Sequence, residues 1–144
     1  MIVLDTNVLS ELIRPTPEAT LVAWLDSLPT EEVLTTAVTA AELLYGVARL
    51  PAGSRKTALT DAVHALIHED LRGRVEPFDA ASADHYALVV TGREKAGLPI
   101  SVADAQIAAI CRTRRATLAT RNTKDFVDTG IELVDPWQPG PLPG

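Results

Sequence analysis

Short apolar runs rich in β-branched residues alternate along this chain with longer segments of helical periodicity. The apolar runs, which are short enough to be buried strands, are residues 2–4, 33–38, 75–78, 117–120 and 131–134. Segments with apolar residues three and four positions apart, which predict helices, are residues 18–28, 39–50, 54–70, 79–96 and 101–114. Strands that alternate with helices predict a mainly parallel sheet covered on both faces, which is a three-layer α/β/α domain.

The chain shows one domain and a short tail. Its 144 residues suit one hydrophobic core, and no interdomain linker or internal repeat is visible. We expect the domain to cover residues 1–137, with a helical hairpin around residues 51–54 and a flexible Pro/Gly-rich tail at 138–144. The single cysteine, Cys111, allows no internal disulfide, and no signal peptide or membrane span is recognisable, so we expect a cytoplasmic protein.

Four acidic residues stand at predicted junctions between elements: Asp5, Glu42, Asp104 and Asp125. Asp5 directly follows the first strand, and the others lie in the first turns or loops that follow later strands. In a parallel sheet, the end of a strand and the start of the next helix lie at the same edge. We therefore expect these carboxylates to meet at one edge of the sheet, although they are far apart in the sequence.

Each acid also has a purely structural explanation. Asp5 can cap the turn that follows it. Thr39-Ala40-Ala41-Glu42 matches a capping box, in which Thr39 begins the helix and Glu42 folds back onto it. Ser101 and Asp104 repeat that arrangement, and Asp125 fits a surface turn.

Together the acids predict a metal site. Four clustered carboxylates repel one another, and hard divalent cations such as Mg²⁺ or Mn²⁺, which bind carboxylate oxygens and water, relieve that repulsion. Other chemistry finds less support: His64 and His68 lack a third metal ligand, and the chain has no phosphate-binding glycine loop or G-x-S-x-G motif.

These motifs resemble those of PIN-domain ribonucleases, specifically VapC/FitB-type toxins of bacterial toxin–antitoxin pairs. The matching segments are IVLDTNVLS at 2–10, TAAEL at 39–43, ADAQIA at 103–108 and LATRN at 118–122. The resemblance implies that Asp5, Glu42 and Asp104 are metal-binding catalytic acids. It also implies that the hydroxyls of Thr6 and Thr120 steady the site, and Asn7 belongs to the same motif.

The fourth acidic position departs from the pattern of close relatives. Such relatives can carry an acid where this chain has Asn122, so either Asp125 supplies the fourth carboxylate or Asn122 binds through its amide or a water. Basic residues cluster nearby in the sequence and are candidates for holding an RNA backbone, Arg121 first among them: Arg112, Arg114, Arg115, Arg121 and Lys124.

The predicted function is therefore metal-dependent hydrolysis of RNA by a toxin that a cognate antitoxin holds inactive. The resemblance also implies a homodimer, for which the apolar stripes at 21–28 and 43–50 could supply the interface unless they pack in the core. The net charge of −6 argues against a general DNA coat or a membrane-surface binder. Two alternatives remain: a non-cleaving module that binds RNA or the antitoxin, and a metal-dependent phosphatase.

Overall fold

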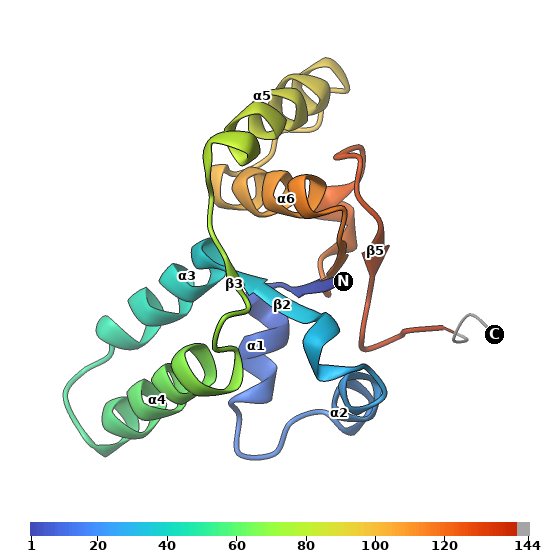
Figure 1. Ribbon diagram of the computed structural model, residues 1–144. Helices are drawn as coiled ribbons and strands as arrows, with labels where there is room; N and C mark the ends of the chain where they lie inside the picture. The colour runs from blue at the N-terminus through green and yellow to red at the C-terminus, as the bar shows by residue number, and fades with distance from the viewer. Residues whose placement is uncertain (141–144) are drawn as a thin grey trace.

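A computed structural model describes residues 1–140 and shows a parallel sheet of five strands between two layers of helices (Figure 1). The elements in chain order are β1 (Ile2–Leu4), α1 (Thr6–Leu12), α2 (Ala19–Asp26), η1 (Thr30–Glu32), β2 (Val33–Thr36), α3 (Ala37–Ala48), α4 (Ser54–Ala65), η2 (Leu66–Asp70), β3 (Val75–Glu76), α5 (Ala80–Lys95), α6 (Val102–Arg114), β4 (Thr117–Ala119), η3 (Thr123–Phe126) and β5 (Leu133–Val134). The predicted three-layer α/β/α fold is confirmed.

The strand order β3-β2-β1-β4-β5 places the first strand in the centre of the sheet. All four strand pairs are parallel, with Ile2 beside both Val33 and Thr117. The chain moves outward on one side of β1 through β2 and β3, and then on the other side through β4 and β5. Such a reversal of strand order opens a crevice at the carboxyl ends of the strands, where open α/β sheets bind ligands.

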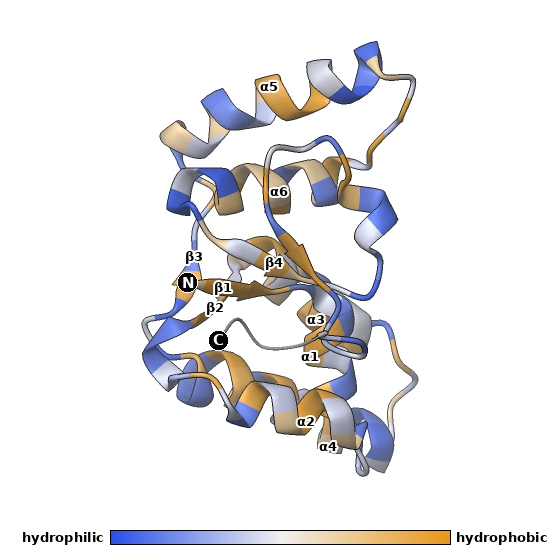
Figure 2. Cartoon of the chain, turned by 90° about the vertical axis from the view of Figure 1, so that its right-hand side faces the viewer, coloured by the Kyte–Doolittle hydropathy of each residue, from blue (hydrophilic) through white to orange (hydrophobic). Residues whose placement is uncertain are grey.

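The alternation of side chains along the strands divides the core into two layers. On β1, Val3 packs in the cluster under α5 and α6, whereas Leu4 packs in the cluster with α1 to α4. Leu118 and Ala119 divide in the same way on β4. Figure 2 shows β1 as a hydrophobic strand between helices of mixed hydropathy. Because both faces are covered, the short strands read in the sequence as continuous apolar runs.

The helical hairpin predicted around residues 51–54 is formed by α3 and α4, and it belongs to the core. Leu43 and Val47 of α3 and Val63 of α4 are buried in the same cluster as Leu21 and Trp24 of α2. The two apolar stripes considered as a dimer interface are thus explained by core packing.

Several elements differ from the sequence prediction: α1 was not predicted, β3 ends at Glu76 and not at 78, and β5 begins at Leu133 and not at 131. The difference that bears on the site lies between β2 and α3. The second strand ends at Thr36 and not at 38, and α3 begins at Ala37, two residues before Thr39. The side chain of Thr36 is the cap, because its hydroxyl accepts a hydrogen bond of 3.0 Å from the amide of Thr39. The capping box assigned to Thr39 and Glu42 is therefore wrong. β-Branched Val38 suggested a longer strand, but tertiary packing overrides that weak preference.

The segment after β5 ends the described part of the chain. Residues 135–138 form a turn in which Gln138 N donates to Asp135 O at 2.9 Å, and part of the predicted tail, residues 141–144, lies outside the described residues. Across residues 1–140, none of the helices combines the length and apolar character that crossing a bilayer requires.

Candidate active site at the carboxyl edge of the sheet

Asp5 lies between β1 and α1, beside the end of β4. Its amide continues the sheet by donating to Ala119 O at 3.0 Å, and its Oδ1 accepts from the amide of Thr6 at 2.8 Å. Asp5 is thus the cap of α1, as its structural explanation held. Its other oxygen does something a cap does not require: Oδ2 accepts from the hydroxyl of Thr120 at 2.8 Å and from Asn7 Nδ2 at 3.3 Å.

Asn7 and Thr120 join the two segments that follow β1 and β4. Asn7 Nδ2 donates to the Thr120 hydroxyl at 3.1 Å, and Asn7 Oδ1 accepts from the amide of Arg121 at 3.1 Å. The Thr120 hydroxyl also accepts from the amide of Asn122 at 3.1 Å. This network fixes the carboxylate of Asp5, because Oδ1 accepts from a backbone amide and Oδ2 accepts from the side chains of Thr120 and Asn7.

Glu42 lies in the second turn of α3, beyond the amides that a capping residue could serve. Its Oε1 accepts a hydrogen bond of 2.8 Å from the hydroxyl of Thr6, which lies 3.3 Å from the hydroxyl of Thr39. Glu42 is exposed, and its contact with Thr6 brings it beside the residue that follows Asp5. The corrected start of α3 removes the structural explanation for this acid and leaves it at the edge where Asp5 lies.

Asp104 occupies the first turn of α6, where its amide donates to Ser101 Oγ at 3.1 Å. Burial and, next, the negative charge of Asp5 raise the pKa of its carboxyl; with smaller contributions from the charges of Asp125 and Glu42, and against a lowering by the hydrogen bond with Ser101, that pKa is about 6. Burial likewise raises the pKa of Asp5, and the charge of Glu42 adds to this, while the bond from Thr120 opposes it. The predicted acids therefore share one electrostatic environment.

Comparison with known proteins gives the family. The family model described as PIN domain matches residues 2–132. The chain belongs to the PIN-domain family. It is 38% identical over 139 residues to a VapC ribonuclease of Sinorhizobium fredii, covering 96% of this chain and 99% of the relative. It is 42% identical over 137 residues to Toxin FitB of Neisseria gonorrhoeae, covering 95% of this chain and 99% of that toxin.

The fold agrees with this assignment. The crystal structure of FitAcB from Neisseria gonorrhoeae matches with a TM-score of 0.88 and 42% sequence identity, over 95% of this chain and 99% of that one. The recognition of a PIN domain similar to VapC/FitB-type toxins is confirmed, and the region matched by the family model includes all four candidate acids.

For the fourth position of this PIN domain we propose Asp125 rather than Asn122. Asp125 lies in η3 and is one of the charges that raise the pKa of Asp104. Asn122 is exposed, and its described hydrogen bonds use its backbone: its amide donates to Thr120, and its carbonyl accepts from Asp125 N at 3.0 Å. We keep Asp125 as the proposed fourth carboxylate and assign Asn122 to the support of Thr120.

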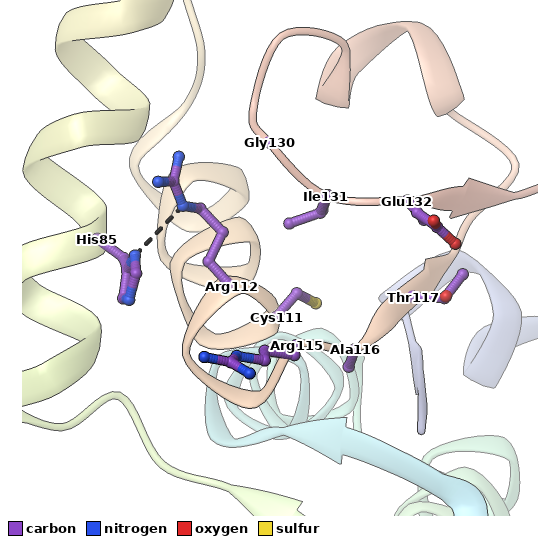
Figure 3. Close-up of a pocket in the computed structure, with 9 residues that line it drawn as sticks. All are labelled: His85, Cys111, Arg112, Arg115, Ala116, Thr117, Gly130, Ile131 and Glu132. Atoms are coloured by element: carbon purple, nitrogen blue, oxygen red, sulfur yellow. Dashed lines mark hydrogen bonds between the residues drawn. The ribbon is translucent and has the colours of Figure 1, made fainter.

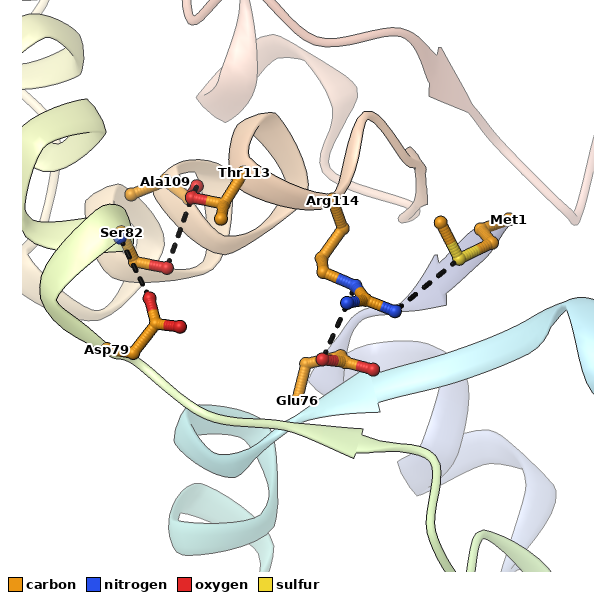
Figure 4. Close-up of polar contacts among 7 residues, drawn as sticks. All are labelled: Met1, Glu76, Asp79, Ser82, Ala109, Thr113 and Arg114. Carbon is orange, nitrogen blue, oxygen red and sulfur yellow. Dashed lines mark hydrogen bonds and ion pairs between the residues drawn. The ribbon is translucent and has the colours of Figure 1, made fainter.

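The basic residues that are close in sequence separate in the fold. Arg112 is half-buried, donating to His85 Nδ1 at 3.2 Å and to Thr129 O at 3.1 Å, and with Arg115 it lines a hollow at the far end of α6 (Figure 3). Arg114 reaches back to Met1 and pairs with Glu76 at 3.4 Å (Figure 4). It follows Asp104 by ten residues on α6, or about 15 Å of helix.

Arg121 alone of the arginines in that group lies in the hydrogen-bonded network beside Asp5. Its side chain is exposed, and its guanidinium carbon lies 4.9 Å from the centre of the Trp137 ring. That cation–π contact holds the long side chain near the site. The sequence had indicated Arg121, but it gave no signal for Trp137, because a contact between a loop and the last turn leaves no periodic pattern.

The carboxylate donor set suits a hard divalent cation that keeps part of its hydration shell. Across residues 1–140, three or more His, Cys, Asp or Glu side chains do not converge into a ready-made cage. The three ion pairs found in this range involve Glu11, Glu32 and Glu76, and none of the four candidate acids. Mg²⁺ commonly binds through one or two carboxylates and keeps several waters, so uncompensated acids of this kind fit it.

Proposed function

We propose that this protein is a Mg²⁺- or Mn²⁺-dependent endoribonuclease that acts as the toxin of a toxin–antitoxin pair. The observation that carries the proposal is the position of Asp5, held by Thr120 and Asn7, beside Glu42, held by Thr6, where the order of the strands reverses. The charges of Asp5, Asp125 and Glu42 also raise the pKa of Asp104. Membership of the PIN-domain family and the similarity to a VapC ribonuclease and to Toxin FitB support the same conclusion.

Asp5 and Asp104 are the proposed principal metal ligands, Glu42 holds the first ion or its water, and Asp125 completes the site. A bound divalent cation supplies a water of lowered pKa and stabilises negative charge on the phosphate oxygens. Carboxylate oxygens rather than His or Cys side chains make up the donor set, which favours Mg²⁺ or Mn²⁺ over zinc.

The neighbouring residues orient these acids. Thr120 and Asn7 hold Oδ2 of Asp5, so that the carboxylate keeps one orientation when substrate or metal arrives. The hydroxyl of Thr6 does the same for Glu42. Arg121, exposed beside the acids and held by Trp137, offers a cation to the phosphate backbone of RNA. Without such a cation, the acidic edge would repel the substrate.

The proposed partner is a small antitoxin. The resemblance to VapC/FitB-type toxins implies one. A chain 42% identical to this one has been solved in the crystal structure of FitAcB. A basic side chain of such a partner, placed over the acidic edge, would be favoured electrostatically. We also keep the homodimer as a proposal from the resemblance, with an interface outside the buried stripes of α2 and α3.

The direct test is cleavage of a structured RNA by purified protein with added Mg²⁺ or Mn²⁺. We expect products with 5′-phosphate and 3′-hydroxyl ends, loss of cleavage on chelation, and loss of cleavage in Asp5→Asn and Asp104→Asn proteins. Full activity of either variant would contradict the proposal. RNA binding without cleavage would favour the non-cleaving module, and turnover of a mononucleotide but not of RNA would favour the phosphatase.

A further inference from the structure

Arg93, near the end of α5, is a buried cation without an acidic partner. Its side chain is 4% exposed, and it takes no part in the three ion pairs of residues 1–140. Its guanidinium donates instead to three backbone carbonyls: Nε to Leu98 O at 2.9 Å, Nη2 to Pro99 O at 3.1 Å, and Nη1 to Val127 O at 2.7 Å. All three nitrogens of the guanidinium are thus used.

Core packing alone does not explain a charged residue at this position. Arg93 follows Val89 by one helical turn, where a buried apolar side chain would avoid the desolvation of a cation. Unlike an apolar side chain, the planar guanidinium presents several N–H donors in fixed directions. A residue of this type is suited to join several pieces of irregular backbone.

The three carbonyls belong to two segments that lead to candidate acids. Leu98 and Pro99 lie in the connection before Ser101, which caps α6 and so sets the place of Asp104. Val127 directly follows η3, the short helix that contains Asp125. Leu98 is held twice, because its amide also donates to the carbonyl of Arg93 at 2.9 Å.

A second arginine shows what is particular to Arg93. Arg112 also holds the loop after η3, through Thr129 O at 3.1 Å, but its other bond goes to His85 on α5. Neither of these hydrogen bonds reaches the connection before α6. Arg93 contacts both segments with one rigid group, so its geometry fixes their relative position.

We propose that Arg93 is a positioning residue, whose buried guanidinium holds the start of α6 with Asp104 at a fixed place against the end of η3 with Asp125. The inference rests on the proposed function, in which these two acids serve one metal site. Residues that orient metal ligands from outside the ligand set commonly change metal affinity by about 10- to 100-fold when they are replaced.

The test measures Mn²⁺ binding to Arg93→Met and Arg93→Lys proteins by electron paramagnetic resonance, in the absence of RNA. We expect Mn²⁺ affinity to fall about tenfold in Arg93→Met. It should fall less in Arg93→Lys, which keeps the positive charge but lacks the planar set of N–H donors. In RNA cleavage, kcat at low Mn²⁺ should fall and recover as Mn²⁺ is raised, while KM for RNA stays unchanged.

Arg74 provides a matched control. Its guanidinium also donates to three carbonyls, those of Thr30, Val33 and Asp70, but Thr30 and Val33 flank the start of β2, at the opposite edge of the sheet. Arg74→Met should lower the thermal unfolding temperature while leaving Mn²⁺ affinity within about twofold of the unaltered protein. This control separates a general loss of stability from a misplaced metal site.

The outcomes are distinguishable. If the unaltered protein binds Mn²⁺ and both Arg93 variants bind it equally well, the positioning role is overturned and the proposed function stands. Equal losses in the Arg74 and Arg93 variants would also overturn it, since stability alone would explain them. If Arg93→Met does not fold, the Mn²⁺ affinity of Arg93→Lys decides. Failure of the unaltered protein to bind Mn²⁺ would refute the proposed function itself.

Discussion

Glu32 at the amino edge of the sheet and the four candidate acids at the carboxyl edge differ in how their charges are compensated. At the amino edge, where the strands begin, Glu32 pairs with the amino group of Met1 at 3.0 Å. At the carboxyl edge, Asp5, Glu42, Asp104 and Asp125 take no part in the ion pairs of residues 1–140, and burial and mutual repulsion raise the pKa of Asp5 and of Asp104. The charge of Glu32 is thus compensated within the fold, whereas the four acids that we propose as metal ligands have no cationic partner among the described ion pairs.

The strongest test of this contrast replaces one acid at each edge. Asp5→Asn should reduce RNA cleavage by more than about 100-fold, because it alters a proposed direct ligand of the metal. Glu32→Gln, which removes an acid at the amino edge, should leave cleavage within about twofold, since an exposed ion pair contributes little. Initial rates on a single labelled RNA give both values. Similar losses in the two variants would abolish the distinction between the edges.

The next largest expected effect is the stabilisation of the folded state by a bound divalent cation. Binding of Mg²⁺ or Mn²⁺ to the folded state alone should stabilise it by about 2.7 kcal/mol at one hundred times the dissociation constant, which raises the unfolding temperature by several degrees. Thermal unfolding with and without the cation measures this. The Asp104→Asn protein, with one proposed ligand removed, should show a much smaller shift, and an equal shift in both proteins would place the cation elsewhere.

A third test sharpens the composition of the acidic edge. Asp125→Asn should lower cleavage about tenfold, because its charge faces Asp104 and helps to hold the cation. Asn122→Ala should change cleavage less than about threefold, since the described hydrogen bonds of Asn122 come from its backbone. Dose–response curves in Mn²⁺ compare the two variants, and the reverse order of effects would move the fourth position to Asn122.

The smallest expected effect is on stability without metal. The pKa of Asp104 is raised from 3.8 to about 6, so ionisation of this group favours unfolding, and stability falls as pH rises from about 4 to 6. Asp104→Asn should therefore be more stable than the unaltered protein above pH 6, by about 1 kcal/mol after solvent screening, and no more stable near pH 4. Urea unfolding in chelator across this range checks the sign. A variant less stable at pH 7 would show that the carboxylate stabilises the metal-free fold.

The acids were predictable because they stand at junctions that the hydrophobic pattern marks. Asp5 directly follows the apolar run at residues 2–4, which forms β1. Ser101 was expected to cap the helix that contains Asp104, and it does so in the structure. Glu42 was assigned to the correct edge for a wrong local reason, since Thr36 and not Thr39 caps its helix. Because the cap lies three residues earlier than expected, Glu42 does not fold back onto the start of its helix and accepts a hydrogen bond from Thr6 instead.

The closeness of the basic residues in the sequence did not predict where they lie in the fold. Arg112, Arg114 and Arg121 are close in the chain, yet α6 carries the first two away from Asp104 while the turn after β4 returns the third to Asp5. Arg93 gave no functional signal, because a charged residue in a helix usually faces solvent, and its three carbonyl partners are set by two loops.

The sequence by itself determined the α/β architecture, the parallel sheet and the junctions at which the acids stand, because hydrophobic periodicity and caps are local properties of the chain. Tertiary structure alone decided that β1 lies between β2 and β4, that Thr120 reaches Asp5, and that one buried arginine joins the segments of Asp104 and Asp125. Those contacts depend on strand order and on the packing of distant loops, which the pattern of neighbouring residues does not encode.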